Sequence, residues 1–175
     1  INNPNDANDL GIGMVHQHFK LVHNFTVLES IVLGRETTKM GVLKMDAARK
    51  KVMELSEKYK FKIDPDAYIS DITVGMQQRV EILKMLYCDN DILIFDEPTR
   101  GIDVGAKQEI YKLMDELVAQ GHSILMVSSE MVELMGMADR IIVLANHRKA
   151  GELTKEQFSQ EAILTLASDE TPKAV

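Results

Sequence analysis

The sequence predicts an α/β fold in which a core of parallel strands carries an inserted helical segment. Two short apolar runs, 92–95 and 124–127, each end in polar or acidic residues, as strands buried in a parallel sheet do. Apolar residues also recur at helical spacing over 26–59, 80–86 and 104–119. With 175 residues, of which 45% are hydrophobic, the chain is long enough to form one domain with a substantial core.

The first part of the chain predicts a short strand followed by helices. Residues 11–19 have the pattern of a strand that delivers Gln17 to a loop. The helical pattern from 26 to about 59 has two apolar faces, and Asp46 is expected to cap the second. These faces consist of Val27, Ile31 and Val32, and of Ala48, Val52, Leu55 and Tyr59.

A helix start suited to binding an anion follows at residues 72–79. Thr73, Gly75 and Gln77 supply a hydroxyl, a glycine and an amide just before an apolar helical face at Val80, Leu83 and Leu86. The first backbone N–H groups of a helix have no partner within it, and the positive end of its dipole lies there. The sequence therefore predicts a site for a negatively charged group at this helix start.

The strand at 92–95 ends in two adjacent carboxylates, Asp96 and Glu97. Open α/β sheets bind their ligands at the carboxyl ends of their strands. In a site that hydrolyses a nucleotide, one such carboxylate can hold Mg²⁺ through its coordination shell while the other polarises the attacking water. The alternative without chemistry is a core strand that ends in an acidic turn.

The rest of the chain predicts a helix at 104–119 and two further strands. Asp103 is expected to cap this helix and Gly121 to end it. The strands are expected at 123–127 and 140–144, with a short helix at about 130–135 between them. Thr154 and Gln157 have the spacing of a capping box for a final helix from about 155 to 166.

In their order along the chain, these motifs resemble the ATP-binding subunit of an ABC transporter of the sugar and nucleoside importer type. The resemblance covers about residues 10–167. Asp96 and Glu97 match the Walker B aspartate and the catalytic glutamate of that family. The other matches are Gln17 with the Q-loop glutamine, residues 72–77 with the signature motif, Asp103 with the D-loop aspartate, and Ser129 with the position of the switch histidine.

The resemblance implies a P-loop NTPase-like fold and transport-coupled ATP hydrolysis. The cofactors would be ATP and Mg²⁺, with Mg²⁺ held through the shell of Asp96 and the water oriented by Glu97. Each nucleotide would lie between two ABC ATPase domains, and membrane permease subunits would be further partners. The nucleotide would be sensed or contacted by Gln17, Thr73, Gly75, Gln77, Asp103 and Ser129.

The chain departs from the family pattern in ways that predict a fragment. It contains no GxxxxGK followed by Ser or Thr, and it begins at Ile1 without a methionine. We therefore expect the phosphate-binding loop to lie outside it, and the isolated chain to be inactive and either marginally stable or prone to aggregation. Val74 and Met76 replace usual signature residues, and Ser129 lacks the imidazole of a switch histidine.

The pattern of these departures suggests a join between two halves of a double-length ATPase. Residues 11–94 resemble the first nucleotide-binding half of such proteins, and the part from 96 onward resembles the second half. The join would lie near 96–100. A single half that matched the whole chain continuously would contradict this hypothesis.

The expected organisation is one partial ABC ATP-binding domain over 1–175. A helical subdomain would span about 22–88, and the sheet core would span 1–21 and 89–152, followed by a C-terminal helix and tail at 153–175. The expected function is the ATP-binding and ATP-hydrolysing part of an importer for simple sugars or nucleosides. The alternative is a catalytically inactive remnant or permease-binding module.

Composition and charge limit the other functional classes. The net charge of −7 disfavours nucleic acid as a partner, and the long heptad arms of the DNA-repair relatives are not present. No apolar run approaches the length of a membrane-spanning helix, so we expect a cytoplasmic protein, peripheral on the inner face of the cell membrane. His16 and His18 have no Cys or carboxylate partner at ligand spacing, which disfavours a metal site there.

Overall fold

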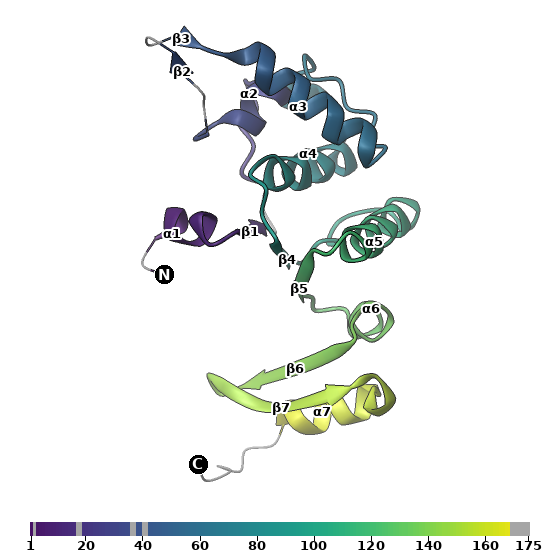
Figure 1. Ribbon diagram of the computed structural model, residues 1–175. Coiled ribbons are helices and arrows are strands. Elements are labelled where there is room, and N and C mark those ends of the chain that lie inside the picture. The colour runs from purple at the N-terminus through teal and green to yellow at the C-terminus, as the bar shows by residue number, and fades with distance from the viewer. Residues whose placement is uncertain (2, 17–18, 36–37, 40–41, 169–175) are drawn as a thin grey trace. The chain divides into compact units, whose positions relative to one another are not determined.

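A parallel sheet lies at the centre of the first part of the molecule (Figure 1). It consists of three strands in the order β1 (Ile12–Val15), β4 (Ile92–Asp96) and β5 (Ser123–Val127). The register places Phe95 of the central strand beside Val15 of β1 and Met126 of β5. The parallel pairing confirms the predicted α/β fold class.

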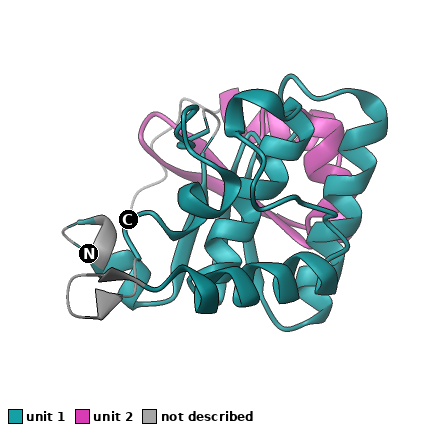
Figure 2. Ribbon diagram, turned by 90° about the horizontal axis from the view of Figure 1, so that it is seen from above, with its two compact units in different colours: residues 1–127 teal, residues 128–175 magenta. Residues whose placement is uncertain are grey.

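The computed structural model describes residues 1, 3–16, 19–35, 38–39 and 42–168. The chain forms two compact units, 1–127 and 128–175 (Figure 2). The domain boundaries expected from the sequence remain a prediction.

The helices of the first unit pack beside the sheet and beside one another. They are α1 (Pro4–Asp9), α2 (Val27–Val32), α3 (Met45–Lys58), α4 (Val74–Tyr87) and α5 (Val104–Ala119), with a 3₁₀ turn η1 at Ile69–Asp71. α4 contacts β1 as well as α2 and α3, so it joins the helical insert to the sheet. Leu83 of α4 and Leu93 and Phe95 of β4 are 0% exposed, so both elements contribute to the core of this unit.

Both helices that follow candidate motifs begin with a side-chain cap, and for α5 this is the predicted residue Asp103. Thr73 accepts a hydrogen bond from the N–H of Met76 at the start of α4, and Asp103 accepts one from the N–H of Ala106 at the start of α5. α5 also has its predicted bounds. Gly121 follows its last turn with a φ of +98°, a conformation that glycine adopts without strain.

The insert is less continuous than the sequence pattern predicts. α2 ends at Val32, and Gly34 follows with a φ of +82°, which takes the chain out of the helix. An antiparallel pair of short strands, β2 (Thr38–Lys39) and β3 (Val42–Leu43), then separates α2 from α3. The predicted cap Asp46 is wrong: it lies within the first turn, and Lys44 is the N-cap without a side-chain bond.

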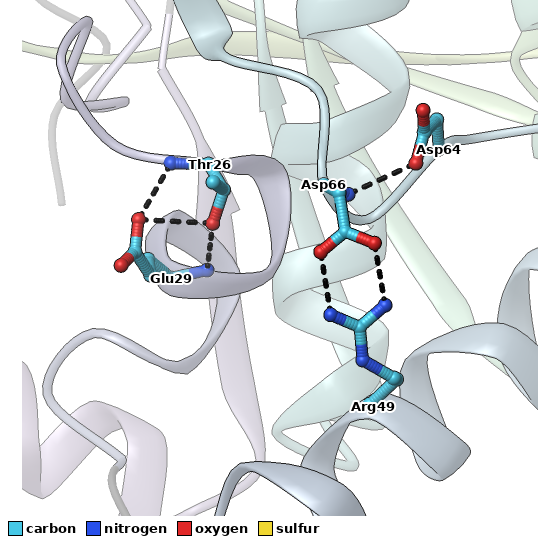
Figure 3. A network of polar contacts seen from close by, with 5 residues as sticks. All are labelled: Thr26, Glu29, Arg49, Asp64 and Asp66. Carbon is cyan, nitrogen blue, oxygen red and sulfur yellow. Dashed lines mark hydrogen bonds and ion pairs between the residues drawn. The ribbon is translucent and has the colours of Figure 1, made fainter.

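Side-chain contacts hold the start of α2 and the loop after α3 (Figure 3). Thr26 and Glu29 form a capping box, in which Thr26 accepts from the N–H of Glu29 and Glu29 accepts from the N–H of Thr26. Arg49 of α3 donates two hydrogen bonds to the carboxylate of Asp66, at 2.8 and 2.5 Å. The N–H of Asp66 also donates to the Asp64 carboxylate at 3.0 Å, which fixes this loop on the insert.

The second unit is built from local contacts. α6 (Met131–Met137) precedes an antiparallel hairpin of β6 (Arg140–Ala145) and β7 (Arg148–Thr154). Asn146 and His147 connect the strands, and both have positive φ, as a two-residue type I′ hairpin turn requires. Among the described residues of this unit, the buried hydrophobic side chains form one small cluster: Ile141, Val143, Leu153 and Ile163.

The C-terminal part of this unit differs from the predicted single helix over about 155–166. Thr154 and Gln157 form the predicted capping box, but it begins only a 3₁₀ turn, η2 (Lys155–Gln157). Phe158 is extended, and the final helix, α7, runs over Gln160–Ser168. Ser159 accepts a hydrogen bond from the N–H of Ala162 at 3.0 Å, so it supplies a second helix start that interrupts the predicted single helix.

A membrane span is not found among the helices of the described residues, since none is both long and apolar enough to cross a bilayer.

Candidate functional site

Asp96 and Glu97 lie where the central strand β4 ends, as the sequence predicts. Both are partly buried, and Thr99 just beyond them is 1% exposed. Glu97 has a φ of +51°, which is uncommon for a residue other than glycine, and its N–H donates to the carbonyl oxygen of Val127 in β5 at 2.8 Å. Such strained conformations cluster at functional sites. The contact with β5 fixes the turn that carries both carboxylates.

His16 lies beside these carboxylates at the end of β1. Val15 is in register with Phe95, so the next position along the parallel pair sets His16 beside Asp96. Burial is the main cause that lowers the pKa of His16; the charge of Lys20 lowers it further, and Asp96 opposes both. The neutral imidazole is therefore favoured near neutral pH. The sequence analysis considered His16 only as a metal ligand, and its pairing beside Asp96 follows from the order of strands in the folded sheet.

Gln17, the predicted Q-loop residue, lies outside the described residues. It follows His16 directly in the sequence. Its role remains a prediction.

The starts of α4 and α5 open onto one hollow. This hollow has a volume of about 340 Å³. A Cβ atom added to Gly75 would lie 3.9 Å from the Cβ of Ala106, which shows how closely the two helix starts approach. Two helix N-termini that face the same space favour an anion there. The hollow is lined by Thr73, Val74, Gly75, Met76, Arg79, Gly101, Ile102, Asp103 and Ala106.

The side-chain amide of Gln77 forms hydrogen bonds to backbone groups of the first unit. Its Nε2 donates to the carbonyl oxygens of Ile69 and Ile72, at 3.1 and 3.3 Å. These bonds hold the 3₁₀ turn η1 against the first turns of α4. Gln77 also lines a second hollow, with Phe19, Leu21, His23, Val74, Arg100 and Gly101.

Arg79 connects α4 to its surroundings. Its guanidinium pairs with the Glu109 carboxylate on α5 and donates to the carbonyl oxygen of Phe61 at 3.5 Å. The pair with Glu109 links the two helices that border the hollow.

Ser129 belongs to the second unit, where it precedes α6. Its neighbour Ser128 accepts a hydrogen bond from the N–H of Glu130 at 3.0 Å and donates one to Glu133. The role of Ser129 at the position of the switch histidine remains a prediction.

Comparisons with known proteins agree with this arrangement. Residues 3–100 match the family model described as ABC transporter. The chain is 44% identical to the nucleoside import ATP-binding protein NupA of Lactococcus lactis, over 99% of this chain and 35% of that protein. It is 45% identical to the guanosine import ATP-binding protein NupO of Bacillus subtilis, over 95% of this chain and 32% of that protein. The chain thus spans about a third of the length of these curated relatives.

One alignment bears on the proposed join between two halves. The match to NupA runs over 179 residues and includes nearly all of this chain within 35% of that protein. A single stretch of one relative therefore accounts for both sides of residues 96–100, and the alignment gives the join no support.

A solved structure shows the same fold. An ATP-binding cassette of an ABC transporter, in its ADP conformation, matches 96% of this chain and 68% of its own with a TM-score of 0.75 and 22% identity. The match to the family model and the identity with the import ATP-binding proteins settle the relationship. This chain belongs to the ABC transporter family, among its ATP-binding proteins.

Proposed function

We propose that this chain forms part of the ATP-hydrolysing machinery of an importer for nucleosides or simple sugars. The observation that carries the proposal is the pair of carboxylates at the end of β4, fixed by the bond from Glu97 N–H to Val127. The relatives named as nucleoside, guanosine and ribose import ATP-binding proteins support the substrate class. The machinery would act at the inner face of the membrane, with a second ABC ATPase domain and membrane permease subunits as partners.

The residues at the end of β4 suit Mg²⁺ bound together with ATP. Mg²⁺ prefers oxygen ligands and is commonly held by one or two carboxylates plus substrate phosphates. Asp96 supplies such a carboxylate, and the described residues contain no group of three or more His, Cys, Asp or Glu that would form an all-protein cage. Mg²⁺ would supply charge neutralisation at the phosphates. Asp96 would hold and orient it through its coordination shell.

Glu97 would act on the attacking water. The water oxygen forms a bond to the γ-phosphorus as the bond to the β–γ bridging oxygen breaks, and Glu97 orients the water or accepts its proton. The neutral form of His16 keeps a positive charge away from Asp96. Gln17 would sense the γ-phosphate, and Thr73, Gly75 and Gln77 would face the nucleotide of the partner domain. Asp103 and Ser129 would be further nucleotide contacts.

The test measures Mg·ATP hydrolysis by the complete gene product that carries this chain. Glu97→Gln should lower the rate by about a hundredfold or more while ATP still binds, because it removes the proton acceptor but keeps the side chain's size. Glu161→Gln, at an exposed position on α7, is the matched control and should leave the rate unchanged. Equal loss in both variants would contradict the role of Glu97.

One further outcome would distinguish the alternative function, a permease-binding module, from ATP hydrolysis. A wild-type product that binds a permease but neither binds nor hydrolyses ATP would be a permease-binding module. That result would overturn the proposed hydrolysis.

A further inference from the structure

A buried carboxylate connects α4 to the segment that follows Gln17. Glu81 lies in the middle of α4 and is 4% exposed. Its Oε1 accepts a hydrogen bond from the backbone N–H of Lys20 at 2.7 Å. Lys20 comes three residues after Gln17 in the sequence, so this bond joins a helix and a loop that are 61 residues apart along the chain.

The surroundings of Glu81 make this bond important for the local structure. Its neighbours Val80 and Ile82 are 0% exposed, and burial is the main cause that raises the pKa of Glu81. The bond from Lys20 and the charges of Lys84 and Lys20 act in the opposite direction. A buried carboxyl group is costly unless it is hydrogen-bonded, so the Lys20 N–H offsets a cost that an apolar residue would avoid.

The donor is a backbone group, and the acceptor sits on a rigid element. A bond to the backbone fixes the path of the loop whatever side chain occupies position 20. α4 is a 14-residue helix with Thr73 at its N-cap, and Arg79 pairs with Glu109 of α5. A displacement of the Lys20 segment would therefore be carried through Glu81 to the helix start at the hollow.

We propose that Glu81 is a positioning residue that makes α4 move together with the segment at Lys20, which follows Gln17 by three residues in the sequence. The proposal rests on the proposed function, in which Gln17 responds to the γ-phosphate and the start of α4 faces nucleotide. It assigns to Glu81 the mechanical link between these two motifs. Glu81 contacts no reacting group in this proposal and acts only through the Lys20 backbone.

Two substitutions separate the hydrogen bond from the buried charge. Glu81→Gln and Glu81→Met both remove the charge and have similar length, but only glutamine keeps an oxygen that can accept from Lys20. In the complete gene product, hydrogen exchange of the peptide containing the Lys20 amide should be at least about tenfold faster in Glu81→Met, and close to wild type in Glu81→Gln. Lys20→Ala is the matched control and should keep the protection, because the donor is the backbone.

The coupling itself is measured by adding Mg·ATP. In the wild type and in Glu81→Gln, nucleotide should change exchange in both the peptide around residues 19–25 and the peptide around 74–80. In Glu81→Met the change around 74–80 should fall at least about threefold, while the KM for ATP stays within about twofold. A merely structural hydrogen bond would leave the nucleotide response of α4 intact in Glu81→Met, and that result overturns the proposal. Equal exchange of the Lys20 amide in Glu81→Gln and Glu81→Met would also overturn it, because the hydrogen bond would then not be what holds this segment.

The two proposals can fail separately. If the wild type shows no response to Mg·ATP and no hydrolysis, the proposed function is wrong, and the coupling role that rests on it is wrong with it. If the wild type hydrolyses ATP but Glu81→Met keeps a protected Lys20 amide, only the proposed link is wrong. If Glu81→Met does not fold, a second measurement on the wild type replaces it. The NMR chemical shift of the Lys20 amide proton, followed against pH, should then change as the Glu81 carboxyl group titrates. A shift that does not follow this titration would overturn the link.

Discussion

The two units of the molecule differ in how far along the chain their contacts reach. In the first unit, β1 pairs with β4 across the whole helical insert, and β4 pairs with β5 across α5. In the second unit, β6 and β7 pair across a two-residue turn. Every described candidate site residue except Ser129 lies in the first unit, at a strand end or helix start. Long-range pairing thus brings together the motifs that the sequence keeps apart.

The units also differ in how completely their cores exclude water. Phe95, Leu93 and Leu117 of the first unit are 0% exposed, whereas the buried cluster of the second unit has exposures of 6 to 8%. More complete burial leaves less room for neighbouring atoms to relax when a side chain is removed. The same kind of substitution should therefore cost more in the first unit.

The largest expected difference comes from truncating one core residue in each unit. Leu93→Ala in the central strand should lower the free energy of unfolding by about 3 to 5 kcal/mol, and Ile141→Ala in β6 by about 2 to 3 kcal/mol. Urea titration with hydrogen exchange assigned to peptides of each unit measures both. Equal losses, or a loss in both units from either variant, would show that the units share one core and one cooperative transition.

The next largest difference comes from two glycines that face close neighbours. A Cβ atom at Gly13 would lie 2.4 Å from Nδ2 of Asn90, which is 1% exposed, and 3.1 Å from Sδ of Met85. A Cβ atom at Gly151 would lie 2.6 Å from Cδ2 of Leu166, a partly buried side chain that can shift. Gly13→Ala should therefore cost about 2 to 3 kcal/mol and Gly151→Ala about 1 kcal/mol, measured by urea titration.

Gly136 in α6 provides the control for these glycines. A Cβ atom there meets no heavy atom within 4 Å, and alanine favours a helix more than glycine does. Gly136→Ala should raise stability by about 0.5 to 1 kcal/mol. A cost for Gly136→Ala as large as that for Gly13→Ala would refute the argument from close approach.

The same contrast explains which parts of the fold the sequence predicts. β4, β5 and α5 were predicted with bounds that differ by at most one residue, because apolar runs and a capping residue mark their ends. β7 was not predicted, since its sequence is mostly polar and it is held by pairing with β6. The break after α2 was also missed, although Gly34 is a signal that could have revealed it.

The candidate site divides along similar lines. The cap Asp103 and the helix start at 72–79 depend on local sequence and were predicted, whereas the turn at Glu97 depends on a bond to β5. The bond between Glu81 and Lys20 joins segments that no local pattern relates. Tertiary contacts of this kind are absent from residue spacing, so only the folded chain reveals them.

The smallest expected effect is an opposite pH dependence in the two units. Burial raises the pKa of Glu81 above the ordinary glutamate value of 4.5, so its contribution to stability is fully present below 4.5 and is lost as pH rises through the folded-state pKa. Hydrogen bonds from Lys149 and then Arg140 lower the pKa of Glu152, so its contribution is present above 4.5 and is lost as pH falls through the folded-state pKa. Unfolding of each unit, followed by peptide-resolved hydrogen exchange from pH 3 to pH 7, should show these slopes. Glu81→Gln should flatten only the slope of the first unit above 4.5, and Glu152→Gln only that of the second below 4.5. A slope of the first unit that survives Glu81→Gln would mean that another group dominates its titration.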